Sequence, residues 1–431
     1  MICANITRNE TGALCFGGAD VAELVRKYGS PLYLMDESRI RERCRVYMQA
    51  MKAAFGSDAL PLYAGKAAAF MHMYRIMRDE GLGVDVVSGG EIFTAHEAGF
   101  PMERAYFHSN NKTDADIAFA MECGVGRFVV DNTEELAAID RIAGEQGKVQ
   151  AILLRLTPGI DPHTYEAVAT GKVESKFGSA IETGQAAEIT RQALACKNVA
   201  LTGFHCHVGS QVFDSDVYLR ASEIMLQFCA DMRAQLGYTA QELDLGGGYG
   251  VRYVESDPHI DIAANIAQVG AAIRAQCAKL ELPVPAIRME PGRSIVADAG
   301  MTVYTVGTVK RIPGYKNYVS VDGGMTDNPR FALYKSAYTV LPVAQPAGPE
   351  MECSVVGRCC ESGDIIQEHV RLPESIHRGD LIAVATTGAY NYSMASNYNR
   401  VARLPIVMLR DGADRMVVRR ESLADLVRND L

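Results

Sequence analysis

Residues 60–67 read Leu-Pro-Leu-Tyr-Ala-Gly-Lys-Ala, a short apolar run that ends in a glycine and a lysine. An apolar run of this length, closed by a turn residue, is typical of a buried strand. The pattern recurs along the chain, so we expect eight strands, at residues 60–64, 83–88, 105–109, 127–131, 150–157, 200–208, 242–246 and 285–290. Between them, apolar residues spaced by three and four predict helices that include residues 69–80, 113–121, 134–143, 186–195, 216–236 and 262–280.

Strands that alternate with helices form parallel sheets. Eight such units over roughly 230 residues are what a (β/α)₈ barrel needs, since this fold typically takes about 250 residues. After residue 293 the sequence becomes β-like, with strands expected at 302–312, 317–321, 352–356, 364–371, 381–386, 405–409 and 415–418. We therefore expect an α/β chain, with a TIM-like (β/α)₈ barrel at residues 32–292. Residues 1–31 and 293–431 are expected to form a mainly antiparallel β domain that completes the active site.

The composition of the chain restricts its partners and its location. With 431 residues it is too long for a single core. A formal net charge of -9 argues against a nucleic-acid surface, so small molecules are the expected partners. No signal segment and no apolar run long enough to span a bilayer is evident, and the eleven cysteines lack a paired framework. The sequence therefore predicts a cytoplasmic protein with reduced thiols and no membrane contact.

Polar residues and glycines gather where the predicted strands end, and in a (β/α)₈ barrel the chemistry takes place at that rim. Lys66 follows the first strand, Asp85 and Ser88 lie at the second, and Ser109 with two asparagines follows the third. The later strands end in Arg155, in His205 and His207, in residues 246–248, and in residues 290–293. This distribution predicts an active site at the rim.

Lys66 is the candidate for covalent attachment of an aldehyde cofactor. A lysine that is desolvated can lose its proton and form a Schiff base. The apolar residues on both sides of Lys66 predict a position withdrawn from the surface. An ordinary solvated lysine is the plain alternative.

Residues 246–250 read Gly-Gly-Gly-Tyr-Gly and leave backbone N–H groups without side-chain cover, which suits a phosphate. A dinucleotide site is disfavoured, because the stretch does not open a helix followed by an acidic residue about 20 positions later. A simple tight turn remains the alternative. Ser210 could add a hydroxyl to the same phosphate.

His205 and His207 stand two apart on a predicted strand, so their side chains share one face. One could stack on a cofactor ring while the other is a hydrogen-bonded core histidine. The pair also resembles the metal ligands of amidohydrolase barrels, but the other histidines do not follow that order, and we expect no metal. Glu290 could keep a pyridine ring protonated as an electron sink, or simply pair with Arg293.

Four motifs, taken together and in order, resemble the fold-type-III, alanine-racemase-like pyridoxal-phosphate decarboxylases. They are Tyr-Ala-Gly-Lys66-Ala, Gly-Phe-His-Cys-His207-Val-Gly-Ser210-Gln, Leu-Asp-Leu-Gly-Gly-Gly248-Tyr-Gly and Met-Glu290-Pro-Gly-Arg293-Ser-Ile-Val. The resemblance covers nearly the whole chain. Within the family, the chain is most similar to the branch that decarboxylates diaminopimelate, through residues 170–178, 321–334, 360–364 and 388–399.

The resemblance implies pyridoxal 5′-phosphate as cofactor. It places the cofactor on Lys66, with His207 on the ring and Glu290 at the pyridine nitrogen. The remaining cofactor contacts are expected from Asp85, Ser210, Gly247, Gly248, Gly292, Arg293 and Tyr390. It further implies that Cys360 is the proton donor, with Lys66 as the alternative, and that the substrate is contacted by Arg293, Arg330, Tyr334, Glu361 and Tyr390.

The implied reaction converts meso-2,6-diaminopimelate to L-lysine, the last step of lysine biosynthesis. The residue types agree, because two arginines can bind a remote carboxylate and Glu361 can accept from a remote ammonium. Ornithine or lysine would leave one arginine without a carboxylate partner. Residues 358–359 and 391–392 depart from the family pattern, which keeps a related substrate such as carboxynorspermidine open.

Three other functions are kept as alternatives. An amino-acid racemase would share the fold and cofactor, but the Cys360-Glu361 segment and the long β domain speak against it. A non-catalytic pyridoxal-phosphate carrier would need only the barrel, and a metal-dependent amidohydrolase would need further metal ligands. In the resembled family the Cys-Glu segment comes from the partner subunit, so the resemblance implies a homodimer with shared active sites, and two-fold pairs are the commonest homo-oligomers.

Overall fold

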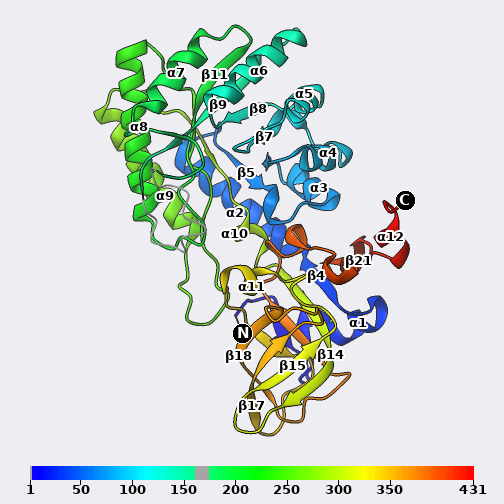
Figure 1. The fold of residues 1–431 in the computed structure, drawn as a ribbon. Coiled ribbons are helices and arrows are strands. Elements are labelled where there is room, and N and C mark those ends of the chain that lie inside the picture. Colours follow the sequence, from blue (N-terminus) through cyan, green and yellow to red (C-terminus); the bar gives the residue numbers. More distant parts are fainter. Residues whose placement is uncertain (1, 161–173) are drawn as a thin grey trace. The chain divides into compact units, whose positions relative to one another are not determined.

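The computed structural model describes residues 2–160 and 174–431, so Thr170 and Gly171 lie outside the described residues. The contacts within the chain divide it into two compact units. The barrel unit comprises residues 44–250 and 259–294, and the sheet unit comprises residues 1–43, 251–258 and 295–431. Figure 1 traces the chain through both units.

The barrel unit contains a closed ring of eight parallel strands, as the sequence predicts. Each strand pairs with the next along the chain, and the last pairs with the first through Arg288 opposite Leu60 and Met289 opposite Pro61. The strands are β5 (Leu60–Ala64), β6 (Gly83–Val86), β7 (Ala105–Phe107), β8 (Arg127–Val130), β9 (Gln150–Thr157), β11 (Val199–His205), β12 (Glu242–Asp244) and β13 (Ala286–Met289). A two-residue strand, β10 (Ser179–Ala180), pairs in parallel with the end of β9.

Helices surround this ring, as Figure 1 shows. Local sequence fixes several of their starts: the side chains of Ser88, Thr113 and Asn132 each accept a hydrogen bond from the backbone N–H three residues later. The helices that follow the strands are α3 (Met71–Asp79), α4 (Gly89–Glu97), α5 (Asp114–Glu122), α6 (Thr133–Glu145), α7 (Gln185–Ala195), α8 (Asp216–Leu236) and α9 (Ile262–Lys279). Among the described helices, none has both the length and the apolar character needed to cross a membrane.

Six of the eight barrel strands end one to three residues earlier than the sequence pattern predicts, and β5 and β9 end where expected. β11 stops at His205 instead of residue 208, and β12 stops at Asp244 instead of residue 246. Gly246 has a positive φ of 67°, a conformation that glycine adopts without strain, so the backbone turns away from the ladder there. Apolar residues alone cannot reveal this turn, because they continue past the last ladder hydrogen bond.

The sheet unit is built on a mainly antiparallel sheet, as expected, in the order β18-β17-β15-β14-β4-β20-β21. Two pairs, β15 with β17 and β4 with β20, are parallel. The strands are β4 (Leu32–Asp36), β14 (Gly300–Arg311), β15 (Asn317–Val321), β17 (Glu350–Val356), β18 (Ile365–Pro373), β20 (Ile406–Arg410) and β21 (Ala413–Val418), with β16 (Val340–Pro342) on β19 (Leu381–Ala385) beside β14. Residues 32–36 thus pair within this sheet and not within the barrel.

The amino-terminal residues belong to the core of the sheet unit. Strands β1 (Ile6–Arg8), β2 (Leu14–Phe16) and β3 (Ala19–Asp20) form a small sheet, and helix α1 (Val21–Tyr28) follows it. One buried apolar cluster combines Ile6, Phe16, Leu24, Met301 and Val407 with their neighbours. Burial of such side chains stabilises the unit by about 1.5–3 kcal/mol each.

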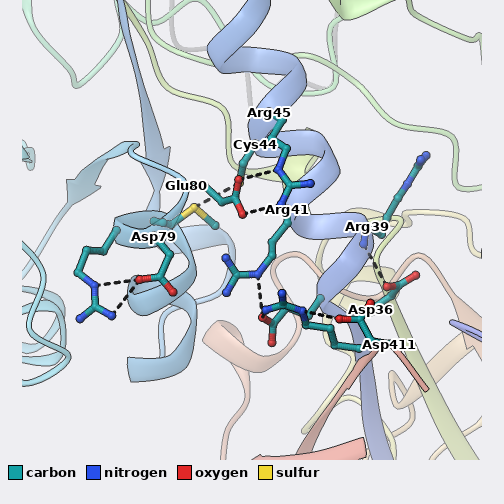
Figure 2. A network of polar contacts seen from close by, with 12 residues as sticks. Asp36, Arg39, Arg41, Cys44, Arg45, Asp79, Glu80 and Asp411 are labelled. Carbon is teal, nitrogen blue, oxygen red and sulfur yellow. Dashed lines mark hydrogen bonds and ion pairs between the residues drawn. The ribbon is translucent and has the colours of Figure 1, made fainter. Parts of the chain in front are cut away.

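Helix α2 (Glu37–Phe55) begins in the sheet unit and ends in the barrel unit, and polar contacts lie along it (Figure 2). In the barrel unit, Arg45 donates to both carboxylate oxygens of Glu80, at 2.9 and 3.1 Å. In the sheet unit, the backbone N–H of Arg39 donates to Asp36 at 3.1 Å, and Arg41 donates to Glu37 at 2.8 Å. Each unit therefore holds its own part of α2.

Candidate active site

Lys66 lies just after β5, in a single 3-10 turn formed by Gly65–Ala67. Its Nζ is 3.7 Å from Oδ2 of Asp85, which is buried at the end of β6. The predicted withdrawal of Lys66 from the surface is wrong for the side chain, which is 43% exposed. The turn buries Gly65 and Ala67 and directs the residue between them outward, so the amine can be reached by a cofactor and a substrate.

Four barrel strands bring a buried cluster of ionisable side chains together. Nε2 of His108, after β7, is 2.8 Å from Oε1 of Glu290, after β13, and 3.9 Å from Oδ1 of Asp85. Nε2 of His205, at the end of β11, is 3.4 Å from Oε2 of Glu290. The ligand atoms of both histidines and Glu290 lie within 4.8 Å of one another, which is also a spacing that a metal ion could use. Glu290 therefore has an imidazole at each carboxylate oxygen.

Burial dominates the protonation of this cluster. Burial lowers the pKa of His205 to about 4, so this imidazole is neutral at pH 7. Burial raises the pKa of Asp85 and, more strongly, that of Asp244, whose Oδ1 accepts from the backbone N–H of Gly246 at 2.8 Å. Burial also raises the pKa of Glu290. The two histidines lower this pKa by more, so that it lies well below the ordinary value.

The glycine stretch at 246–248 is packed too closely for any side chain. A Cβ on Gly247 would lie 2.0 Å from the carbonyl oxygen of Glu290, and one on Gly248 would lie 2.2 Å from that of Gly209. The stretch thus presents bare backbone after β12, which is what an anionic group needs for close approach. Arg293 donates to Ser210 at 2.8 Å in the same unit. At Gly292 a Cβ would lie 3.0 Å from that of Ala64, so this position is crowded as well.

His207 is partly buried beside the glycine stretch. Its Nδ1 accepts from the backbone N–H of Gly247 at 3.2 Å, which leaves Nε2 to hold the ring proton. Burial, followed by the positive charge of Lys66, lowers the pKa of His207 well below its ordinary value. A neutral, flat ring held in this way is suited to stacking on an aromatic cofactor.

In the sheet unit, Arg330 begins the short helix α11 (Arg330–Tyr334) and is buried. Its guanidinium donates to Tyr338 at 2.9 Å and to Ser336 at 3.2 Å, and lies 6.0 Å from the ring centre of Tyr390. Within the part of the chain that the structure describes, no carboxylate lies at ion-pair distance from it. Tyr334, at the end of α11, is half-buried.

Cys360 and Glu361 are exposed on the loop between β17 and β18. The buried carboxylate of Asp364 holds the loop in place. It accepts hydrogen bonds from the backbone N–H groups of Cys359 at 2.7 Å and Met325 at 2.6 Å. The backbone N–H of Cys360 donates to Asn399 at 2.8 Å. The loop therefore presents a thiol and a carboxylate from a fixed backbone.

The structure thus gathers the predicted site residues into two groups. The barrel unit holds Lys66, Asp85, His207, Ser210, Gly247, Gly248, Glu290, Gly292 and Arg293, and the sheet unit holds Arg330, Tyr334, Cys360, Glu361 and Tyr390. Sequence reasoning missed His108, Asp244, Asp364 and Glu91, whose carboxylate lies near Asp85 and accepts from the backbone N–H of Val87 at 2.7 Å. His108 is the last but one residue of the third predicted strand, so the rim position used for Ser109 could have revealed it. Glu91, Asp244 and Asp364 show no such signal, because only burial and contacts distinguish them from surface acids.

The barrel fold and the family match over residues 37–297 define a pyridoxal-phosphate-dependent decarboxylase. Residues 37–297 match the family model described as the pyridoxal binding domain of pyridoxal-dependent decarboxylases. The curated relatives agree over nearly the full length. Diaminopimelate decarboxylase of Halalkalibacterium halodurans is 43% identical over 424 residues, which cover 98% of this chain and 96% of the relative. The Bacillus subtilis enzyme of that name is 42% identical over 426 residues, with the same coverage.

A solved structure of diaminopimelate decarboxylase from M. jannaschii, in complex with L-lysine, matches with a TM-score of 0.92 and 30% identity. The match covers 100% of this chain and 98% of that one. The chain therefore belongs to the diaminopimelate decarboxylase family. It is a carboxy-lyase that uses pyridoxal 5′-phosphate and acts on a small molecule, an amino acid.

Proposed function

We propose that the protein removes one carboxylate of meso-2,6-diaminopimelate and releases L-lysine, the last step of lysine biosynthesis. The observation that supports this substrate most directly is Arg330, a buried cation that has no carboxylate partner among the described residues. A buried charge is costly unless it is paired. Diaminopimelate brings a second carboxylate, at the end that does not react, and such a group would complete the site of Arg330.

In this proposal the barrel unit binds the cofactor. The residues present fit it: Lys66 offers a reachable amine, His207 a neutral ring, and Glu290 an ionised carboxylate for the pyridine nitrogen. Gly247, Gly248 and Ser210 offer bare backbone and a hydroxyl for the phosphate. Tyr390, which belongs to the sheet unit, is assigned to the cofactor through the family resemblance. Asp85, Gly292 and Arg293 are assigned to the same site. When bound, pyridoxal phosphate supplies an electron sink for the charge left at the α-carbon as CO₂ departs.

The other residues of the chain recognise the substrate and handle the proton. Arg330 and Arg293 bind the remote carboxylate, Glu361 accepts from the remote ammonium, and Tyr334 and Tyr390 line the same substrate. The thiol of Cys360 donates a proton to the α-carbon after decarboxylation, with Lys66 as the alternative donor. Departure of the carboxylate and return of the proton at the same carbon yield the amino acid product.

We further propose a homodimer in which Cys360 and Glu361 complete the site of the partner subunit. Their exposure on a loop with a fixed backbone supports this arrangement. Sedimentation of the purified protein tests it, since a monomer at the concentrations of the assay would contradict shared sites. We place the enzyme in the cytoplasm, because all eleven cysteines are free thiols, as a reducing compartment favours.

The decisive experiment supplies the reconstituted holoenzyme with meso-diaminopimelate and measures CO₂ and lysine together. Equal amounts of both are expected, and Lys66→Ala should abolish their release together with the visible absorbance of the bound cofactor. Parallel assays with ornithine, lysine and carboxynorspermidine test the related substrates. Racemised diaminopimelate without CO₂ would instead identify a racemase.

A further inference from the structure

The carboxylate of Glu290 is held by groups that the proposed function does not use. His108 and His205 contact its two oxygens, at 2.8 and 3.4 Å, and come from strands β7 and β11. All three side chains are at least nine-tenths buried, and the two imidazole rings meet edge to face with their centres 4.9 Å apart. Three strand ends therefore fix this carboxylate.

Burial alone would protonate Glu290. A buried carboxylic acid prefers its neutral form unless nearby charges or hydrogen bonds favour the anion. The other acids around it, Asp85 and Asp244, have raised pKa values because of burial, whereas Glu290 keeps a lowered pKa next to His108 and His205. The two imidazoles thus account for the difference between Glu290 and its acidic neighbours.

Of the two contacts with Glu290, the one from His108 is the shorter. His108 also lies near Asp85, which is the neighbour of Lys66. Its Nε2 is 3.9 Å from Asp85, and Asp85 is 3.7 Å from Nζ of Lys66. His205, being neutral at pH 7, contributes hydrogen bonding without charge. The arrangement places His108 between the lysine that binds the cofactor carbonyl and the carboxylate assigned to the pyridine nitrogen.

We infer that His108 is a positioning residue, which holds Glu290 as an ionised carboxylate facing the ring nitrogen of the cofactor. This inference rests on the role proposed for Glu290. In this role His108 acts through Glu290, and Glu290 acts on the ring nitrogen. Loss of His108 should therefore matter only when that nitrogen is present.

The test titrates the apoprotein with pyridoxal 5′-phosphate and with its 1-deaza analogue, in which a C–H replaces the ring nitrogen. His108→Leu should weaken binding of pyridoxal phosphate by about 10- to 100-fold, the equivalent of one charge-assisted contact. The affinity of the His108→Leu protein for the deaza analogue should differ from that of the wild type by less than about threefold. His108→Gln, which keeps an N–H donor, should recover most of the loss.

A double-mutant cycle adds a second readout. In the Glu290→Gln background, His108→Leu should cause little further loss of affinity for pyridoxal phosphate, because the partner of His108 is already gone. The matched control is His96→Gln, which removes an exposed histidine 3.5 Å from Glu97 and should leave both affinities unchanged.

Three results would overturn the inference. Equal weakening of both cofactors by His108→Leu would make His108 a purely structural residue, and no weakening of either would make it dispensable. Stoichiometric metal in the purified holoenzyme would make His108, His205 and Glu290 ligands instead. None of these results depends on the substrate, so they are separate from the assay of CO₂ release, in which the proposed function succeeds or fails.

Discussion

The carboxylate of Asp364 accepts a hydrogen bond of 2.7 Å from the backbone N–H of Cys359. Its other oxygen accepts from Met325 at 2.6 Å, so one buried side chain joins the loop of Cys360 to the segment that precedes Arg330. Glycines at 324 and 357 make this contact possible, since a Cβ on either would lie within 2.7 Å of the carboxylate. The proposed proton donor therefore depends on a residue outside the substrate site.

Replacing Asp364 with alanine should lower the free energy of unfolding by about 2–4 kcal/mol, because two backbone N–H groups lose a buried, charged acceptor. Urea denaturation measures the change. Asp380→Ala is the matched control. Asp380 accepts one backbone N–H, from His377 at 2.8 Å, and lies 2.9 Å from Nδ1 of the same residue in a more exposed turn, so its loss should cost less than about 1 kcal/mol. Equal losses in the two variants would contradict the assigned role of Asp364.

Gly247→Ala should destabilise the barrel unit by about 1–3 kcal/mol, because its Cβ would overlap the carbonyl oxygen of Glu290. The same change should weaken cofactor binding, measured by absorbance titration. Gly90→Ala serves as the control, since the nearest atom to its Cβ, Oγ of Ser88, would lie 3.7 Å away. A Gly247→Ala protein with unchanged stability would show that the backbone there can relax.

Arg330→Gln should raise KM for meso-diaminopimelate by about 100-fold, the loss expected when a buried charge pair is broken, and should change kcat less. Steady-state kinetics on the holoenzyme separate the two constants. The exposed Arg311, which donates to a carbonyl oxygen at 2.7 Å, provides the control Arg311→Gln, with no expected effect on KM. A fall in kcat with unchanged KM would assign Arg330 to the chemistry instead of to binding.

Glu91 should make stability fall as the pH rises. Burial, and then the charge of Asp85, raises its pKa from 4.5 to about 7. The folded protein then binds a proton more tightly than the unfolded chain, so stability decreases between about pH 4.5 and pH 7, by on the order of 3 kcal/mol. Glu91→Gln should therefore gain stability relative to the wild type from pH 5 to pH 8, as measured by chemical denaturation.

The control for Glu91 is the exposed Glu103. Glu103→Gln should leave the pH dependence unchanged, because the side chain of Glu103 is exposed to solvent. If Glu91→Gln also tracked the wild type at every pH, Glu91 would have to be ionised in the folded protein throughout this range.

The barrel could be predicted because each strand is a short apolar run that ends in a polar residue or glycine. The same rule placed Lys66, Asp85, His207 and Glu290 at the rim. Strand ends were less accurate: the turn at Gly246 depends on close backbone contacts, which no periodicity records. The exposure of Lys66 was missed for a similar reason, since a 3-10 turn changes the direction of one side chain among apolar neighbours.

Contacts between distant strands lay beyond sequence reasoning. His108 and Glu290 are 182 positions apart, and only closure of the barrel brings them within 2.8 Å. The sequence predicts Asp364 only as the first residue of a strand, and its two N–H donors become apparent only in the structure. The cofactor and substrate roles of the predicted residues stay predictions, and the experiments above address them directly.

Pairing of β13 with β5 closes the ring, and it has a consequence for the order in which the protein can mature. In a growing chain Lys66 is synthesised early. Glu290 and strand β13, which pairs with β5, are synthesised only after more than two hundred further residues. A growing chain should therefore bind the vitamin-derived cofactor tightly only after its eighth strand has been synthesised. Chains truncated before residue 286 should leave the ribosome without it, however well their first seven strands have formed.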